Sequence, residues 1–249
     1  PTYELSAGHE EASWHDLLYT VRGNETGRII DEFFKNWVRA GGKKPAQTPV
    51  VIPALGGSAR VESVLTNPHT GFQGLREAHS KAIKAATKEI VAIYPYFSDD
   101  QLVKELIAAK QAKPGLSIKV IMPANKEASH EGSLYSALNK ETARQLLEAG
   151  IEVRMFDGGD VQRFSHLKAM LFDNQLLSIG SANGDARTYN ANHELNTLIQ
   201  DPKAVSEFRA KIVKPDWAAS QPVTLAELKG QSLWDKLKQK VLEALDFLL

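Results

Sequence analysis

The sequence predicts an α/β fold in which helices are layered on a sheet. Short apolar runs that suit buried strands alternate with segments of helical composition from residue 72 to residue 213. The 249 residues are 43% hydrophobic and 24% charged, which is the make-up of a globular chain of one or two domains that can bury a full core.

Each element is placed by its local pattern. A short strand at residues 14–16 precedes a helix at 29–38, where apolar residues recur at helical spacing. Residues 56–72 hold several glycines and a proline and are interpreted as a loop. Asp99 or Ser98 should cap the helix that follows them. The other strands are expected at 49–55, 89–96, 116–122, 151–156, 166–172, 176–179 and 194–199, and the other helices at 72–88, 101–113, 134–148, 201–213 and 232–249.

Composition sets further bounds. The net charge is zero and the pI is about 7.5, so bulk electrostatics gives no sign of nucleic-acid binding. The absence of cysteine excludes disulfides, thiolate chemistry and thiolate zinc sites. No apolar run approaches the ~20 residues that span a bilayer, and no signal peptide opens the chain. The chain begins with Pro1 instead of Met, so we expect a processed chain or a piece of a longer one.

Chemically active side chains gather in one stretch, residues 164–194. His166 and Lys168 lie two residues apart at the start of a predicted strand, so both should leave the same face of the sheet. Ser181 and Asn183, again two apart, follow the next predicted strand and bring a hydroxyl and an amide to a sheet end, where sites on open sheets are usually built. Further residues of interest in the stretch are Asp173, Gly180, Arg187 and Glu194.

These groups suit chemistry on a phosphodiester. Negative charge grows on the non-bridging oxygens as phosphorus is attacked, and fixed donors such as Lys168, Ser181 and Asn183 can stabilise it. An imidazole such as His166 can act near neutral pH if a carboxylate fixes its other nitrogen, and Glu194 is the candidate for that carboxylate. No metal-ligand cluster is visible in the sequence, and we expect neither a metal nor another cofactor.

Three residues are expected to be structural or peripheral. Asp173 lies seven residues from His166, an odd offset that places it on the opposite face of a continuous strand. We therefore expect it to hold a backbone turn or a basic side chain. His15 is a strand histidine with an aromatic neighbour, which is more typical of a structural role, and His130 is interpreted as part of a surface loop.

The spacing His166-x-Lys168-x4-Asp173-x6-Gly180-Ser181-x-Asn183 resembles the HKD signature of the phospholipase D superfamily. Arg187 and Asn192-x-Glu194 resemble the tail that follows this signature in its lipid-acting branch, which includes the cardiolipin synthases. Thr188 stands where that branch usually has Ser, and a hydroxyl is kept. The resemblance implies a phospholipase D-like αβα layered mixed sheet, with Asp173, Gly180 and Arg187 as structural parts of the motif.

The resemblance also implies a division of the chain. In two-repeat members, a Trp-His-Asp or Trp-Arg-Asp strand and a helix ending in Phe-x-x-x-Trp follow the first HKD motif, and residues 14–16 and 33–37 resemble that place. Residues 1–45 would then be the tail of a preceding repeat and a linker. Residues 46–249 would be the second catalytic domain, with a C-terminal amphipathic helix that packs on the core or lies in a lipid interface. Residues 94–97 resemble an aromatic segment of the lipid-acting repeat, where they line the cleft or pack in the core.

By resemblance, two HKD segments face each other over one phosphorus atom. The implied activity is phosphodiester hydrolysis or transphosphatidylation of phospholipids through a phosphohistidine. The first half of two-repeat members usually supplies the nucleophile, so His166 would be the general acid and base while Lys168, Ser181 and Asn183 hold the phosphate. The implied partners are a phospholipid, a second HKD-bearing half (the N-terminal repeat of the same protein or another copy) and a membrane interface met peripherally; nucleic acid is not expected.

Two alternatives stay open on the sequence. The first is a homodimeric single-repeat nuclease of the same superfamily, against which the Trp-His-Asp region and the C-terminal helix count. The second is a non-enzymatic scaffold that binds lipid or protein. The intact set of His166, Lys168, Asn183 and Glu194 argues against this second alternative.

Overall fold

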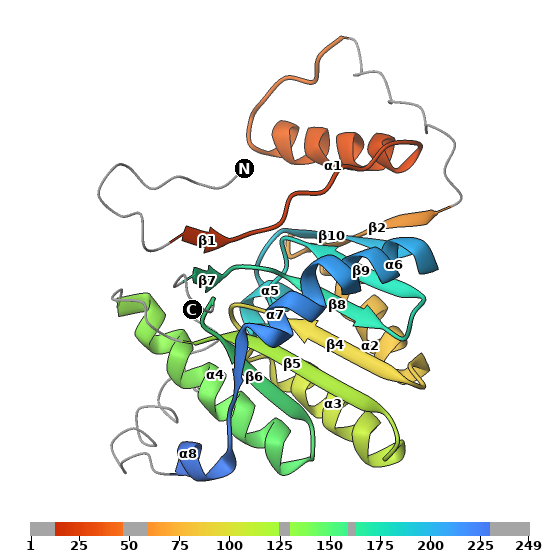
Figure 1. Ribbon diagram of the computed structural model, residues 1–249. Coiled ribbons are helices and arrows are strands. Elements are labelled where there is room, and N and C mark those ends of the chain that lie inside the picture. Colours follow the sequence, from red (N-terminus) through yellow and green to blue (C-terminus); the bar gives the residue numbers. More distant parts are fainter. Residues whose placement is uncertain (1–12, 47–58, 125–129, 159–162, 230–249) are drawn as a thin grey trace.

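A mixed β-sheet forms the centre of the molecule (Figure 1). The computed structural model describes residues 13–46, 59–124, 130–158 and 163–229. Within these residues, nine strands form one sheet in the order β11-β6-β5-β4-β8-β9-β10-β2-β3. β4, β5 and β6 run parallel, and the other neighbours are antiparallel. The strands are β2 (Arg60–Asn67), β3 (Phe72–Gln73), β4 (Glu89–Ile93), β5 (Ser117–Pro123), β6 (Glu152–Phe156), β8 (Ala169–Phe172), β9 (Leu176–Gly180), β10 (Glu194–Gln200) and β11 (Ser220–Pro222).

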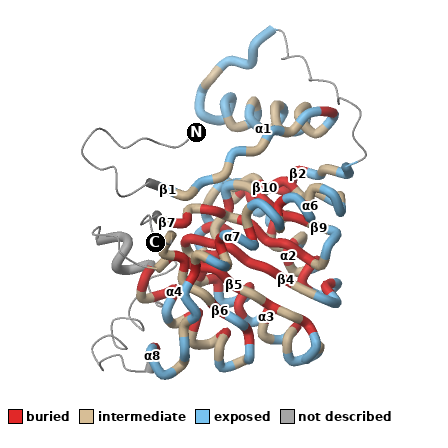
Figure 2. The backbone as a smooth tube through the Cα atoms, in the orientation of Figure 1, coloured by how far each residue is buried: buried red, intermediate tan, exposed pale blue. Residues whose placement is uncertain are grey.

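Helices cover both faces of this sheet. Figure 1 shows α6 and α7 in front of the strands and α2, α3 and α4 behind them. Side chains alternate along β4, so Ile90 and Ala92 pack with α2 and α3 while Val91 and Ile93 pack with α6. Figure 2 shows the strands between the two helix layers as largely buried, and the layered α/β sheet is confirmed. The helices are α2 (Gly74–Ala85), α3 (Asp100–Ala112), α4 (His130–Glu148), α5 (Ala186–Asn190), α6 (Pro202–Phe208), the π-helix η1 (Arg209–Val213), α7 (Lys214–Ala218) and α8 (Leu225–Lys229).

Aspartates start several of these helices. The Asp99 carboxylate accepts the Leu102 amide at 2.8 Å and caps α3, as the sequence predicted. Asp201 accepts the Lys203 amide at 2.8 Å at the start of α6. This helix continues through η1 and α7 to residue 218, beyond the expected end at 213.

Some predicted boundaries are wrong. The expected loop at 56–72 contains β2, which pairs with β10 from Arg60↔Gln200 to Thr66↔Glu194. This long-range pairing makes a strand of a polar segment that the local pattern does not mark. β8 begins at Ala169, so residues 166–168, predicted as the start of this strand, form the link that leads into it. α4 begins at residue 130 instead of 134. The strand predicted at 49–55 and the helix predicted at 232–249 lie outside the described residues.

The N-terminal part of the described chain lies beside the main sheet. β1 (Ser13–His15) pairs in parallel with β7 (Arg163–Ser165), the strand that precedes the motif. α1 (Glu25–Arg39) stands beyond the sheet edge in Figure 1 and has no buried residue. Its Glu25 carboxylate accepts the Ser63 amide of β2 at 2.8 Å. No helix in the described part of the chain is long and apolar enough to cross a bilayer.

Candidate active site

A pocket of about 290 Å³ opens beside the N-terminal segment at the ends of β8 and β9. His166 and Lys168, in the link between β7 and β8, line it together with Gly180 and Ser181 from the end of β9. Leu167 between them is 1% exposed and packs in the core on the α6 side. The Lys168 Nζ donates to the His166 carbonyl at 2.9 Å, which fixes the ammonium beside the imidazole. The expected alternation of side chains therefore holds, although the strand itself begins at Ala169, three residues later than expected.

Gly180 lets β10 approach the pocket closely. A Cβ at this position would lie 2.2 Å from the Leu195 carbonyl oxygen and 2.4 Å from the Asn196 Oδ1, so a larger residue would collide. The Ser181 hydroxyl accepts the Leu195 amide at 3.1 Å and donates to Glu194 at 2.5 Å. The Gly-Ser pair of the motif thus joins the end of β9 to the start of β10.

Asn183 faces Asp185 and is not among the residues that line the pocket. Its side chain hydrogen-bonds Asp185, and within the described residues its buried Oδ1 has no partner. Asp185 in turn accepts the Thr188 amide at 2.7 Å and caps α5. Burial raises the pKa of Asp185, and its hydrogen bonds oppose this effect. The amide expected to hold phosphate is therefore engaged in positioning the loop after β9.

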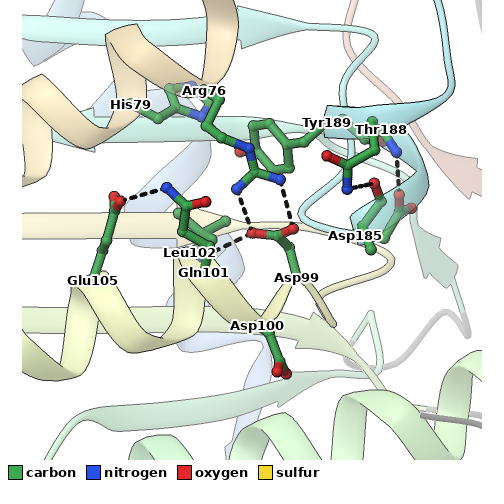
Figure 3. Close-up of polar contacts among 12 residues, drawn as sticks. Arg76, His79, Asp99, Asp100, Gln101, Leu102, Glu105, Asp185, Thr188 and Tyr189 are labelled. Carbon is green, nitrogen blue, oxygen red and sulfur yellow. Dashed lines mark hydrogen bonds and ion pairs between the residues drawn. The ribbon is translucent and has the colours of Figure 1, made fainter. Parts of the chain in front are cut away.

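A second polar network lies around α5 (Figure 3). The Arg76 nitrogens Nη1 and Nη2 each donate to Asp99 at 2.9 Å, and the guanidinium lies 4.3 Å over the Tyr189 ring. The Tyr189 hydroxyl hydrogen-bonds His79 Nδ1 at 2.7 Å, and His79 Nε2 lies 2.8 Å from the Ser178 hydroxyl. Burial, with a contribution from Arg76, lowers the pKa of His79 to about 4, so this ring is neutral. Sequence reasoning missed the network because its members come from separate elements with no common spacing.

The carboxylate that faces His166 is Asp16. Its Oδ2 lies 3.3 Å from the Nδ1 of His166. The pairing of β1 with β7 explains this contact, because the His166 amide donates to the His15 carbonyl at 3.0 Å and brings the next residue against the ring. Asp16 also lines the pocket. No local signal points to it, since 150 positions separate Asp16 from His166.

Glu194 was expected to hold the second nitrogen of His166, and the structure gives it other partners. Its carboxylate accepts from the Ser181 hydroxyl and, at 3.2 Å, from the Asn192 amide nitrogen. Burial raises the pKa of Glu194, and these two hydrogen bonds oppose the rise. Glu194 is thus fixed beside the pocket and does not contact the His166 ring.

Burial also sets the charges on the pocket's two nitrogen bases. It lowers the pKa of His166, the Lys168 ammonium lowers it further, and Asp16 opposes both effects. Burial lowers the pKa of Lys168 to about 8, against the attraction of the carboxylates of Asp16, Glu194 and Asp185. At neutral pH the imidazole therefore stands beside an ammonium that is still mostly charged.

Asp173 lies at the opposite end of β8 from His166. The residue has a φ of 53°, and its carboxylate accepts the amides of Thr87, Lys88 and Glu89 at 3.1, 2.7 and 2.9 Å. Asp173 thus holds a backbone turn away from the pocket from a place past the end of β8. The odd offset had instead led us to expect it on the opposite face of a continuous strand that includes His166. Arg187 lies exposed on α5.

Other sequence candidates lie outside the pocket. The His15 ring stacks on Phe156 at a centroid distance of 5.2 Å, and its Nε2 lies 2.9 Å from Asp216. Tyr94 and Phe97 are fully buried and pack on each other, so these two aromatic residues belong to the core. The side chain of His130 lies outside the described residues.

Comparison with known protein families places more than half of the chain in one family. A family model described as "Cardiolipin synthase, PLD-like domain" matches residues 80–217, more than half of the chain. The matched range contains the link with His166 and Lys168 and the adjoining ends of β9 and β10. The chain belongs to this phospholipase D-like family.

Curated relatives of this phospholipase D-like chain include cardiolipin synthases. That of Staphylococcus aureus (strain Mu50 / ATCC 700699) is 28% identical over 194 residues, covering 78% of this chain and 37% of the relative. That of Listeria welshimeri is 27% identical over 231 residues, covering 92% of this chain and 46% of the relative. The chain thus spans less than half the length of these relatives.

Two solved structures share the phospholipase D fold. The phosphatidylserine synthase of Haemophilus influenzae Rd KW20 has a TM-score of 0.59 at 17% identity, over 91% of this chain and 53% of that one. The phospholipase D family member Nuc from Salmonella typhimurium has a TM-score of 0.53 at 20% identity, over 67% of this chain and 99% of that one. The mixed phospholipase D-like sheet predicted from the sequence is confirmed.

Proposed function

We propose that this chain supplies one of the two HKD segments of an enzyme that hydrolyses or transfers phospholipid phosphodiesters through a phosphohistidine. The observation that carries the proposal is His166, which lines an open pocket with Nδ1 against Asp16 and the Lys168 ammonium alongside. Family membership and the similarity to cardiolipin synthases support a phospholipid substrate. Such a substrate requires peripheral contact with a membrane interface.

His166 is assigned the proton transfers. With Nδ1 against Asp16, Nε2 is the nitrogen left for the reacting groups. In the first step a second histidine forms a nitrogen–phosphorus bond, the phosphorus–oxygen bond to the leaving alcohol breaks, and His166 gives that oxygen its proton. In the second step neutral His166 takes a proton from water or another alcohol, which attacks phosphorus and releases the second histidine.

The growing charge on phosphate is assigned to the fixed donors of the pocket. The Lys168 ammonium is held beside the imidazole and keeps further protons to donate. The Ser181 hydroxyl lies at the pocket wall, and it would join only by turning its one proton from Glu194 to the phosphate. Donors that are already in place need no reorganisation as the phosphorane charge develops. Asn183 would donate to the phosphate only if its side-chain amide gave up its hydrogen bond to Asp185.

The second HKD segment is assigned to a preceding repeat. Residues 1–45 would be the tail of that repeat and the linker, and residues 46–249 the second catalytic domain. Two observations support this division: Asp16 enters the pocket from the N-terminal segment, and the chain spans less than half of its curated relatives. In a pseudo-twofold pair, the carboxylate that follows each HKD motif would hold the histidine of the other half. Asp16 would then serve His166, and Glu194 would serve the histidine of the preceding repeat.

Replacement of His166 tests the assignment. In the protein with both halves present, His166→Asn should lower turnover of phosphatidylglycerol vesicles by about 10²- to 10⁴-fold or more, because the proton donor is lost. His69→Asn, at an exposed histidine outside the pocket, is the matched control. Near-normal turnover by the His166 variant would contradict the proposal. Cleavage of DNA in place of lipid by the unmodified protein would favour the homodimeric nuclease.

A further inference from the structure

A half-buried histidine joins the N-terminal segment to helix α7. The His15 Nε2 lies 2.9 and 3.1 Å from the two carboxylate oxygens of Asp216 on α7. The His15 ring also stacks on Phe156 of β6, at an interplanar angle of 14°. These contacts fix the ring in position and orientation, although His15 does not line the catalytic pocket.

Asp216 is a buried carboxylate that needs such a partner. It is 4% exposed, and within the described residues its carboxylate is hydrogen-bonded by His15, 201 positions away. A buried carboxylate without a partner strongly destabilises a fold, because its charge is taken out of water without compensation. The Ser220 hydroxyl donates to the Asp216 carbonyl at 2.5 Å and secures the end of α7. The pair therefore anchors the N-terminal segment to a rigid part of the fold.

The contact at His15 leads directly to the catalytic ring. Residues 13–19 are here called the strap. Its residues 13–15 pair with β7, and the residues that follow pass along the pocket. The His15 carbonyl accepts the His166 amide at 3.0 Å, and Asp16 meets the His166 imidazole. At the far end of the strap, the Tyr19 hydroxyl donates to the Ile179 carbonyl at 3.2 Å and lies 3.1 Å from the Thr197 hydroxyl. Asp16 is thus held between two side-chain anchors.

We propose that His15 and Asp216 are positioning residues that clamp the strap, so that Asp16 orients His166 for proton transfer. The inference rests on the proposed function and assigns a role to two residues that do not touch the substrate. Backbone alignment of β1 with β7 sets the register, and the His15–Asp216 contact fixes the rotation of the strap about it. Without the clamp, Asp16 would no longer be held against Nδ1 of His166.

The test compares two substitutions of His15 in the protein with both halves present. His15→Phe keeps the stack on Phe156 and removes the donor, whereas His15→Gln keeps a donor for Asp216. We expect His15→Phe to lower kcat by about 10- to 100-fold with little change in KM, as for a misplaced catalytic group. His15→Gln should restore most of the activity.

The pH profile separates positioning from folding. The charged groups that face His166 are Lys168, which favours the neutral imidazole, and Asp16, which favours the protonated one. Displacing Asp16 should therefore move the basic limb of the rate profile to lower pH. If His15→Phe fails to fold, His15→Phe combined with Asp216→Leu removes both polar partners and leaves no buried unpaired carboxylate. The same shift is expected in that protein.

A double-mutant cycle with Asp16→Asn decides between the outcomes. If the clamp acts through Asp16, adding His15→Phe to Asp16→Asn should change kcat by less than about threefold, because coupled residues are non-additive. The clamp would be overturned if the two substitutions lowered kcat by the product of their separate effects. It would also be overturned if His15→Phe lowered thermal stability and left the pH profile unchanged. The proposed function would survive either result as long as His166→Asn is inactive. Full activity of His166→Asn would instead remove the basis of both.

Discussion

At the scale of single residues, the pocket carries a cost in stability at Lys168. Its pKa in the folded protein is about 8, below the 10.5 of an unfolded chain, because burial disfavours the ammonium. This cost is fully present below pH 8 and is relieved as the pH rises from there towards 10.5, since the folded state releases the proton first. The ammonium to which we assign the phosphate charge is thus held in the pocket at the expense of stability.

Replacing Lys168 by Met should therefore raise stability while it removes activity. We expect an increase of roughly 1–3 kcal/mol in the free energy of unfolding at neutral pH, from the size of such a shift. The gain should shrink between pH 8 and 10, where the unmodified protein loses the same charge. Urea unfolding at pH 7 and pH 9.5 measures the difference, with Lys104→Met, at an exposed side chain of α3, as the control. A Met variant that is less stable at pH 7 would contradict this account of Lys168.

Residue spacing predicted the pocket only as far as the local chain reaches. The two-residue offsets of His166 to Lys168 and of Ser181 to Asn183 are encoded locally, and three of these four side chains line the pocket. The partner of His166 could not be predicted, because Asp16 reaches it through strand pairing across 150 positions. Glu194 was a plausible substitute from the same stretch, but the nearby Ser181 and Asn192 bind it.

At the scale of elements, Asp173 ties the turn after β8 to the turn before β4. Three backbone amides donate to its carboxylate, so these hydrogen bonds lower its pKa against the opposing effect of burial. This stabilisation is fully present above the pKa that Asp173 has in the unfolded chain. It is lost as the pH falls through the lower pKa of Asp173 in the folded protein. This contact joins two elements of the core sheet and leaves the pocket untouched.

Asp173→Ala should destabilise the fold without altering the chemistry. Loss of the acceptor should cost roughly 1–3 kcal/mol, since the amides lose their protein partner. Asp173→Asn, which keeps one acceptor oxygen and tolerates the positive φ, should lose less. Thermal unfolding gives the stability order, and kcat per folded molecule should stay within about twofold, as for sites remote from the reaction. A large fall in kcat would place Asp173 in the catalytic machinery.

Elements with a strong local pattern were predicted, and those made by distant pairing were not. β4, β5 and β9 carry apolar runs that are buried on both faces, and α3 carries its own aspartate cap. β2 has a polar sequence between glycines and a proline, which favoured a loop. Its strand conformation comes from β10, to which it pairs along its length in register.

At the scale of the whole molecule, the described chain presents an unpaired apolar surface. α1 has no buried residue, and its Phe33 and Trp37 are 58% and 49% exposed. Leu18 on the strap is 74% exposed, next to the Asp16 that serves His166. Exposed apolar side chains that lie together, as Phe33 and Trp37 do, mark an interaction surface. A preceding repeat, as proposed above, would cover it and bring the second histidine to the pocket.

The 249-residue chain by itself should therefore be inactive as a monomer. It provides one HKD segment, so the nitrogen–phosphorus bond has no second histidine to form it. Co-expression with the preceding repeat should restore turnover and form a one-to-one complex. Light scattering coupled to an assay on phosphatidylglycerol vesicles measures mass and activity on the same sample.

Phe33→Ser with Trp37→Ser should weaken the complex, whereas Lys35→Ser on the exposed polar face of α1 should leave it unchanged. A monomer that turns over substrate with nothing else bound would contradict the two-segment mechanism, because a single imidazole cannot serve as nucleophile and as acid in the same step.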